Sequence, residues 1–247
     1  FGPLRVEDLP TLPPCFATWP RNTLIAMHAE KQSVAVGLGL AAAYNRPVHF
    51  CHISRREEIE LIAQAKAAGL PVTCEVTPHH LFLTEADAAR LGPLGDMRPL
   101  LGTPSDVAAL WEHLGETVDC IATDHAPHTL AEKRSATPPP GVIGLETSLP
   151  LMLTAVQQNR LSLNRLIELM HRNPRRIFNL PEQPDTAVTV QLTPNSITNQ
   201  MVQSKCGWTP FHGTEVLAKV QKVVLRGEVV FEDGRILAQP GSGNLIP

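Results

Sequence analysis

The sequence lacks the marks of several large classes of protein. Its five cysteines are scattered, odd in number and free of any CxxC spacing, which fits a reducing, cytosolic setting. The net charge of −3 leaves no basic footprint for nucleic acid. The longest apolar stretch, residues 34–43, is far too short to span a membrane, and no signal peptide is visible. What remains is an ordinary composition, 43% hydrophobic and 18% charged, which is sufficient for a sizeable core.

Four short apolar runs alternate with helical patterns in the first half of the chain. The runs cover residues 23–27, 47–50, 71–74 and 118–123, and the helical patterns cover residues 29–44, 55–68 and 104–114. This alternation, with short connections, predicts parallel βα units and an α/β fold. Four units cannot close an eight-stranded barrel, so either the sheet is open or half a barrel is absent. Because the chain begins at Phe1 rather than Met, we expect it to be processed, excised or incomplete.

The remaining segments do not continue the alternation of strands and helices. Residues 1–21 are rich in proline and read as a loop with one short helical turn, and residues 146–159 and 161–172 read as helices. Beyond residue 180, short alternating strands are expected at 187–192, 216–225 and 228–237, with hairpin turns at Arg226-Gly227 and Asp233-Gly234. We therefore predict two domains, an α/β part over residues 1–180 and a small β region over residues 181–247.

Side chains able to bind a metal or move a proton follow the ends of the apolar runs. His28, His52 and Asp124 come at the ends of three of them. The carboxyl ends of parallel strands line one rim, so these groups should converge, as the site of a metal-dependent hydrolase requires. A single histidine in an apolar stretch is more often a packed, hydrogen-bonded residue. The agreement of three strand ends favours the metal site.

Two further strand-end residues have competing interpretations. Cys51 suits either the core or a metal, and Glu75 follows a run that should be buried, which favours a functional carboxylate. His79 and His80 could each orient a neighbouring group.

Three loop positions could contact a ligand. Arg98 is either a solvated charge or a bidentate clamp for a carboxylate. His128, four residues after Asp124, could donate to the same ligand. The loop at residues 138–141 (Pro-Pro-Pro-Gly) could offer backbone groups, although rigidity alone explains it.

Four motifs together resemble one family. They are HAE at residues 28–30, VHFCHI at 48–53, CEVTPHH at 74–80 and TDHAPH at 123–128. They are similar to those of dihydroorotases of the amidohydrolase superfamily, above all the dihydroorotase domain of multifunctional pyrimidine-synthesis polypeptides. The likeness continues through residues 138–147 and 173–178.

The resemblance implies an enzyme and a site. Members are zinc-dependent (β/α)8 barrels with a small β subdomain, and they interconvert L-dihydroorotate and N-carbamoyl-L-aspartate. By resemblance, His28 and His52 are ligands of one zinc, and Asp124 is a ligand of another and the general acid and base. Cys51 and Glu75 correspond to residues around a third zinc. Substrate contacts correspond to Arg98, His128 and the backbone of Pro140.

The resemblance also implies what this chain lacks. The family has an early His-x-His-x-Arg motif, a substrate-binding Asn and a carbamylated Lys, none of which is present in the required place. We therefore expect the carboxyl-terminal part of a longer enzyme: the second half of the barrel with part of the β subdomain, inactive by itself. Expected partners are the small-molecule substrate and either a second copy or the other domains of a multienzyme polypeptide, with no nucleic acid or membrane. A non-catalytic half-barrel or inactive homologue, and a hydantoinase- or allantoinase-like enzyme, are the alternatives.

Overall fold

The computed structural model describes residues 6–243 and divides into two compact units, Phe1–Asp124 and His125–Pro247. Among these described residues, no helix is both long and apolar enough to cross a membrane. The predicted domain boundary at residue 180 stays a prediction.

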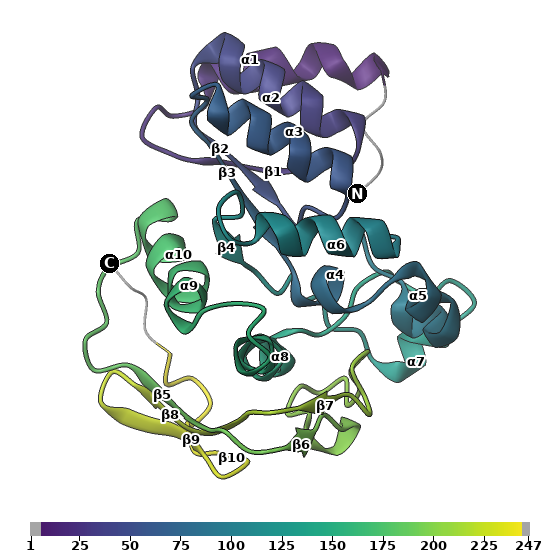
Figure 1. The fold of residues 1–247 in the computed structure, drawn as a ribbon, viewed down its shortest axis with the longest axis vertical. Helices are drawn as coiled ribbons and strands as arrows, with labels where there is room; N and C mark the ends of the chain where they lie inside the picture. The colour runs from purple at the N-terminus through teal and green to yellow at the C-terminus, as the bar shows by residue number, and fades with distance from the viewer. Residues whose placement is uncertain (1–5, 244–247) are drawn as a thin grey trace. The chain divides into compact units, whose positions relative to one another are not determined.

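The first unit is built on a parallel sheet (Figure 1). Its strands are β1 (Ile25–His28), β2 (Val48–Cys51), β3 (Val72–Val76) and β4 (Cys120–Ile121), hydrogen-bonded in the order β1-β2-β3-β4. All three pairings are parallel. The predicted α/β class with a parallel sheet is therefore confirmed.

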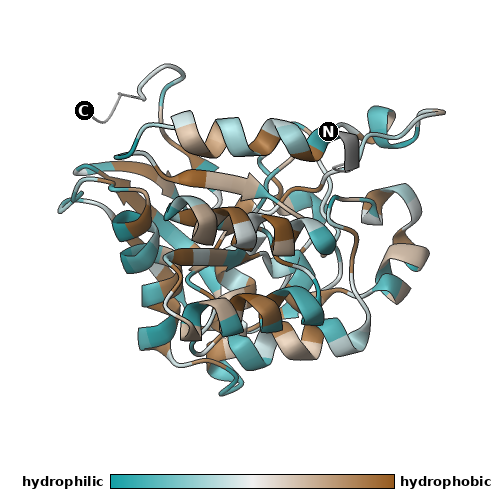
Figure 2. Cartoon of the chain, turned by 90° about the horizontal axis from the view of Figure 1, so that it is seen from above, coloured by the Kyte–Doolittle hydropathy of each residue, from teal (hydrophilic) through white to brown (hydrophobic). Residues whose placement is uncertain are grey.

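Helices connect these strands. They are α2 (Gln32–Tyr44), α3 (Arg56–Ala67), α4 (Pro78–Phe82), α5 (Glu85–Leu91), the 3-10 turn η2 (Gly92–Gly95) and α6 (Pro104–His113). Hydrophobic and hydrophilic residues form alternating bands along the helices (Figure 2). The core under them includes Val34, Phe50 and Ile59, each fully buried. Helix α2 packs so closely on β2 that a Cβ added at Gly37 would lie 2.7 Å from the ring of Phe50.

The start of the chain is more helical than its sequence predicts. A 3-10 helix η1 (Val6–Thr11) leads into α1 (Leu12–Thr18) where one short turn was expected, and residues 1–5 lie outside the described part. Proline occupies the first turn of α1, where its missing N–H costs no helical hydrogen bond. The expectation of a proline-rich loop over residues 1–21 was therefore wrong for most of its length.

The second unit begins with helices. They are α7 (Leu130–Lys133), α8 (Leu145–Gln157), α9 (Leu163–Ile167), a π-helical turn η3 (Glu168–Arg172) and α10 (Asn173–Ile177). The predicted helix at 161–172 is thus interrupted by the π turn. Pro174 has no N–H for the carbonyl of Met170, which accounts for the widened turn just before it.

Antiparallel strands complete the second unit. Strands β5 (Ala187–Gln191), β8 (Lys219–Leu225), β9 (Glu228–Glu232) and β10 (Arg235–Ile236) form a sheet in the order β10-β9-β8-β5. Strands β6 (Asn195–Ser196) and β7 (Glu215–Val216) form a separate pair, with a 3-10 turn, η4 (Asn199–Met201), between them in sequence. Both predicted hairpin turns have positive φ at their two central residues, as type I′ turns require.

Candidate functional site

The carboxyl ends of the four parallel strands carry the predicted site residues. His28 pairs in register with Cys51, and the Phe50–Cys74 pairing places Cys51 beside Glu75 one residue further on. His52 follows directly, and Asp124 comes three residues after β4. Side chains that are up to 96 positions apart in sequence therefore share one edge of one sheet.

The imidazoles of His28 and His52 face each other. His28 Nδ1 lies 2.9 Å from His52 Nε2, and the rings meet edge to face with centroids 4.6 Å apart. His52 adopts a φ of 38°, a conformation that non-glycine residues seldom take and that is found disproportionately at functional sites. The backbone turn after β2 therefore aims His52 back toward His28.

The environment of His52 keeps it neutral. Burial lowers the pKa of His52, and the neighbouring Asp124 carboxylate only partly opposes this effect. Within residues 6–243, His52 Nδ1 is buried without a hydrogen-bond partner. Because a neutral imidazole is the form that binds metals, His52 is chemically suited to be a ligand.

Glu75 is held by a histidine that the sequence analysis did not single out. His49, fully buried, places Nε2 3.0 Å from Glu75 Oε2 and Nδ1 2.7 Å from Thr73 Oγ1. The alternation of side chains along a strand could have identified His49. His49 and Cys51 lie on the same face of β2, and Thr73 and Glu75 lie on the same face of β3. Burial, Glu75 and Asp124 raise the pKa of the Cys51 thiol to about 12. Cys51 is thus a thiol, and only a nearby cation would make it a thiolate ligand.

The donor set fits a metal ion only in part. Two neutral imidazoles with a thiol and carboxylates nearby are donors that zinc accepts. Across the described part of the chain, however, no three His, Cys, Asp or Glu side chains are close enough to hold one ion. The structure therefore supplies a pair of ligands, and the predicted zinc roles of His28, Cys51, His52, Glu75 and Asp124 stay predictions.

Asp124 differs in its surroundings from Asp106 and Asp119, two other carboxylates of the first unit. It is exposed, adopts a φ of 44°, and makes no hydrogen bond or ion pair with any described residue. The carboxylates of Asp106 and Asp119, in contrast, are each bound by several donors. The Asp124 carboxylate is therefore open to solvent, whereas those of Asp106 and Asp119 are used in local structure.

Arg98, the predicted contact for a substrate carboxylate, already has partners within the chain. Its side chain is 49% exposed and its guanidinium is paired with Asp96, with a further bond of 2.9 Å to the carbonyl of Met97. Both bonds use Nη1, so the Nε and Nη2 groups of Arg98 are the donors that a further carboxylate would meet.

The second unit contains His128 and Pro140. The carbonyl of His128 accepts a 2.7 Å bond from the indole N–H of Trp208. Lys133 Nζ donates to the carbonyls of Pro139 and Gly141, on either side of Pro140. Neither Lys133 nor Trp208 was identified from the sequence, because neither belongs to a recognisable spacing.

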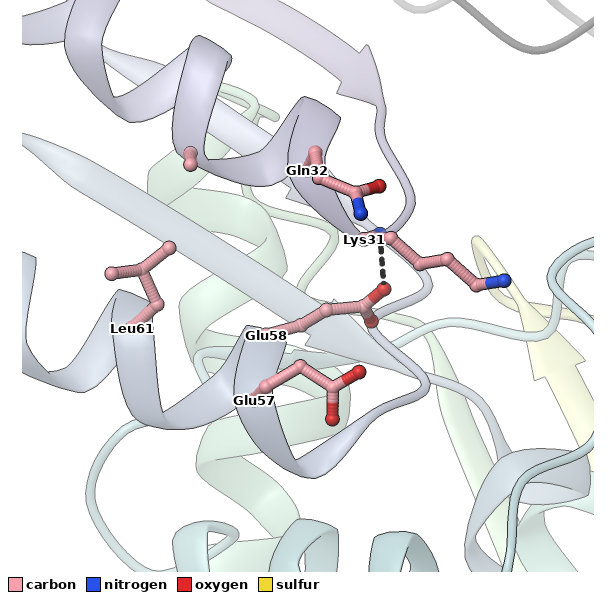
Figure 3. Close-up of a pocket in the computed structure, with 6 residues that line it drawn as sticks. Lys31, Gln32, Glu57, Glu58 and Leu61 are labelled. Carbon is pink, nitrogen blue, oxygen red and sulfur yellow. Dashed lines mark hydrogen bonds between the residues drawn. The ribbon is translucent and has the colours of Figure 1, made fainter.

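A shallow hollow of about 260 Å³ lies where α2 and α3 begin (Figure 3). It is lined by Lys31, Gln32, Ala35, Glu57, Glu58 and Leu61, none of them a predicted site residue. The Glu58 carboxylate beside it already accepts bonds from the backbone N–H groups of Lys31, Ser54 and Arg55. The Glu58 carboxylate at this hollow is therefore already used in the capping box of α3.

The chain is similar in sequence to several known proteins. No protein-family model matches. The chain is 49% identical over 245 residues to the multifunctional protein CAD of Squalus acanthias, covering 98% of this chain and 11% of the relative. It is 34% identical over 225 residues to the dihydroorotase of Pyrococcus furiosus, covering 88% of this chain and 53% of the relative.

Two solved structures resemble this chain. The inactive dihydroorotase-like domain of the Chaetomium thermophilum CAD-like multifunctional protein has a TM-score of 0.78 and 30% identity, covering 96% of this chain and 66% of that one. The L-hydantoinase of Arthrobacter aurescens has a TM-score of 0.82 and 26% identity, covering 94% and 61%. The chain spans about half the length of the dihydroorotases that it matches. Over nearly its whole length, this chain is a homologue of the dihydroorotases and of the dihydroorotase region of CAD-type multifunctional proteins.

Proposed function

We propose that this chain is the carboxyl-terminal part of a dihydroorotase that reversibly hydrolyses L-dihydroorotate to N-carbamoyl-L-aspartate in pyrimidine synthesis. The observation that carries the proposal is the row of His28, Cys51, His52, Glu75 and Asp124 at adjacent strand ends in a homologue of dihydroorotases. A site of this kind suits hydrolysis because strand ends hold polar groups rigidly around one point.

The sheet would be the later half of a (β/α)8 barrel, with the antiparallel strands contributing to a small β subdomain. In β1, Ala26 and His28 are exposed, although parallel sheets are usually covered on both faces. Further strands of the same enzyme pairing at this edge would cover them.

The residues of this chain would divide the work of zinc binding and proton transfer. His28 and His52 would hold one zinc and Asp124 another, with Cys51 and Glu75 around a third. When bound, zinc supplies a Lewis acid that polarises the amide carbonyl and acidifies water.

Asp124 would take the proton from the attacking water and return it to the amide nitrogen as the ring C–N bond breaks. Its exposure and its lack of partners in the described part suit that task. Arg98 would bind the substrate carboxylate, and in the second unit His128 and the Pro140 backbone would contact the substrate. The cation Arg98 favours an acidic substrate, dihydroorotate, over neutral hydantoin.

The partners and setting follow from the relatives. We propose that the chain belongs to a multienzyme polypeptide, since the CAD protein that it matches is about nine times longer than the matched segment. The five free cysteines in the described part fit a reducing compartment such as the cytosol.

Two relatives support alternatives. The Chaetomium thermophilum relative is an inactive dihydroorotase-like domain, so a non-catalytic role is the second candidate. The likeness to L-hydantoinase supports a different cyclic amide as substrate. One experiment separates the three: the longer protein containing this chain is supplied with zinc and assayed on L-dihydroorotate, hydantoin and allantoin. Preferential turnover of dihydroorotate supports our proposal. Preference for either other amide supports the hydantoinase alternative, and no turnover of any supports the inactive one.

A further inference from the structure

Lys133 is an unusual residue for the interior of a protein. It lies at the end of the short helix α7, and it is fully buried, although lysine is among the residues least often buried completely. Its Nζ donates to Pro139 O at 2.9 Å and to Gly141 O at 3.0 Å, and lies 5.7 Å from the ring centroid of Trp208. Burying an ammonium group costs free energy, so the burial of Lys133 indicates that its hydrogen bonds stabilise a specific local structure.

The loop that Lys133 binds is held on both sides of one exposed residue. Pro139 is half-buried and Gly141 is buried, and both of their carbonyls are bound to Nζ. Pro140 between them is exposed. The two bonds therefore fix the backbone on either side of Pro140, and Pro140 itself stays exposed to solvent.

The same loop packs against His128. Gly141 has a φ of 132°, and a Cβ added there would lie 2.7 Å from Ala126 Cβ and 3.3 Å from His128 Cδ2. The N–H of Ala126 donates to Val142 O at 2.9 Å. Residues 126–128 and 140–142 thus form one packed assembly.

Trp208 links this assembly to Lys133 from the other side. Trp208 is 1% exposed, its indole N–H donates to the carbonyl of His128 at 2.7 Å, and its ring lies within cation–π range of the Lys133 ammonium. One buried cation and one buried indole therefore hold both His128 and Pro140.

We propose that Lys133 and Trp208 are positioning residues that jointly set the placement of His128 and the Pro140 backbone for the substrate. This inference rests on the proposed function for its consequence in catalysis, but its structural claim can be tested without activity. Neither residue needs to touch the substrate.

The structural test uses the 247-residue chain labelled with ¹⁵N. Lys133→Met keeps the length of the side chain and removes its donors, and Lys205→Met, at an exposed lysine of the same unit, is the control. In ¹H–¹⁵N spectra we expect the Trp208 indole and Gly141 amide signals to shift in Lys133→Met, while the Trp19 and Trp111 indoles stay in place. Unmoved Trp208 and Gly141 signals would overturn the proposal whether or not the enzyme is a dihydroorotase.

The catalytic test uses the longer zinc-loaded protein. Loss of positioning should raise KM for dihydroorotate at least tenfold in Lys133→Met and in Trp208→Phe, with a smaller change in kcat. Lys133→Arg, which keeps the charge and donors, should recover part of the loss, and Lys205→Met should stay within twofold of wild type. A lowered melting temperature with KM unchanged in both variants would mean a merely structural role and would contradict us. Absence of turnover in the wild type refutes the proposed function, and the spectra then decide the positioning claim alone.

Discussion

At the scale of the residue, this chain uses histidine in several different environments. His28 and His52 face each other at the strand ends, and His49 holds Glu75. His80 is buried and bonded through both ring nitrogens, to Thr77 Oγ1 at 2.8 Å and to Pro99 O at 3.1 Å. Sequence alone gives no means of separating a ligand from a packed histidine, because burial and partners are set by distant segments.

The environment of His80 should make stability depend on pH. Burial lowers the pKa of folded His80 from 6.5 to about 3. Between these values the unfolded chain binds a proton at this site and the folded chain does not. The stability that is present above pH 6.5 is therefore lost as pH falls, by about 1.4 kcal/mol per pH unit.

Replacing His80 with Gln should remove this dependence. We expect the slope of unfolding free energy between pH 6 and 4.5, measured by urea denaturation, to fall by about 1.4 kcal/mol per pH unit. His171→Gln, at an exposed position, should leave the slope as it is. An unchanged slope in His80→Gln would show that folded His80 is protonated in this range.

At the scale of the element, a single carboxylate joins two helices of the first unit. Asp106 caps its own helix, α6, by accepting from Thr103 N at 2.8 Å and Thr103 Oγ1 at 2.7 Å. It also accepts from Arg56 N at 2.9 Å, at the start of α3, and from Arg55 Nη1 at 3.2 Å. Asp87 makes a similar capping box on α5 but is more exposed and binds no other helix through these contacts.

This difference predicts unequal costs for the same substitution. Asp106→Ala should lower the free energy of unfolding by about 3 kcal/mol, because it removes the cap and leaves buried donors unpaired. Asp87→Ala should cost about 1 kcal/mol, the usual value for a cap. Denaturant titration of both variants provides the comparison, and equal losses would refute the joining role of Asp106.

How much could be predicted also differs between elements. The parallel strands that carry His28, Cys51 and Glu75 follow from apolar runs and turn signals, which are local. The π turn at residues 168–172 does not, because it results from Pro174 acting on a carbonyl one turn earlier. The contacts of Lys133 with residues 139 and 141 and of Trp208 with residue 128 depend on loop packing that no periodicity encodes.

At the scale of the whole molecule, the chain supplies part of a site. The described residues present two facing imidazoles and no cluster of three metal-binding side chains. Zinc sites that catalyse hydrolysis have three protein ligands and an open position. The isolated chain should therefore bind zinc weakly and not hydrolyse dihydroorotate.

Isothermal titration of the 247-residue chain with zinc checks this. We expect dissociation constants at least a thousandfold weaker than for the longer protein, since each lost ligand removes much of the affinity. The double variant His28→Ala/His52→Ala should weaken the remaining binding further. Tight zinc binding together with turnover by the isolated chain would mean that self-association completes the site.

The central claim is that Asp124 moves the proton in dihydroorotate hydrolysis, and carboxylates at the two ends of β4 allow a matched test. Asp119, which precedes the strand, accepts from Lys66 Nζ at 2.5 Å and from Cys74 N at 2.8 Å, whereas Asp124 follows the strand and is exposed. The measurement is kcat and melting temperature for Asp124→Asn and Asp119→Asn in the longer zinc-loaded protein. We predict that Asp124→Asn lowers kcat by at least 100-fold at an unchanged melting temperature, and that Asp119→Asn lowers the melting temperature but keeps kcat. Turnover by Asp124→Asn within tenfold of wild type would contradict the account.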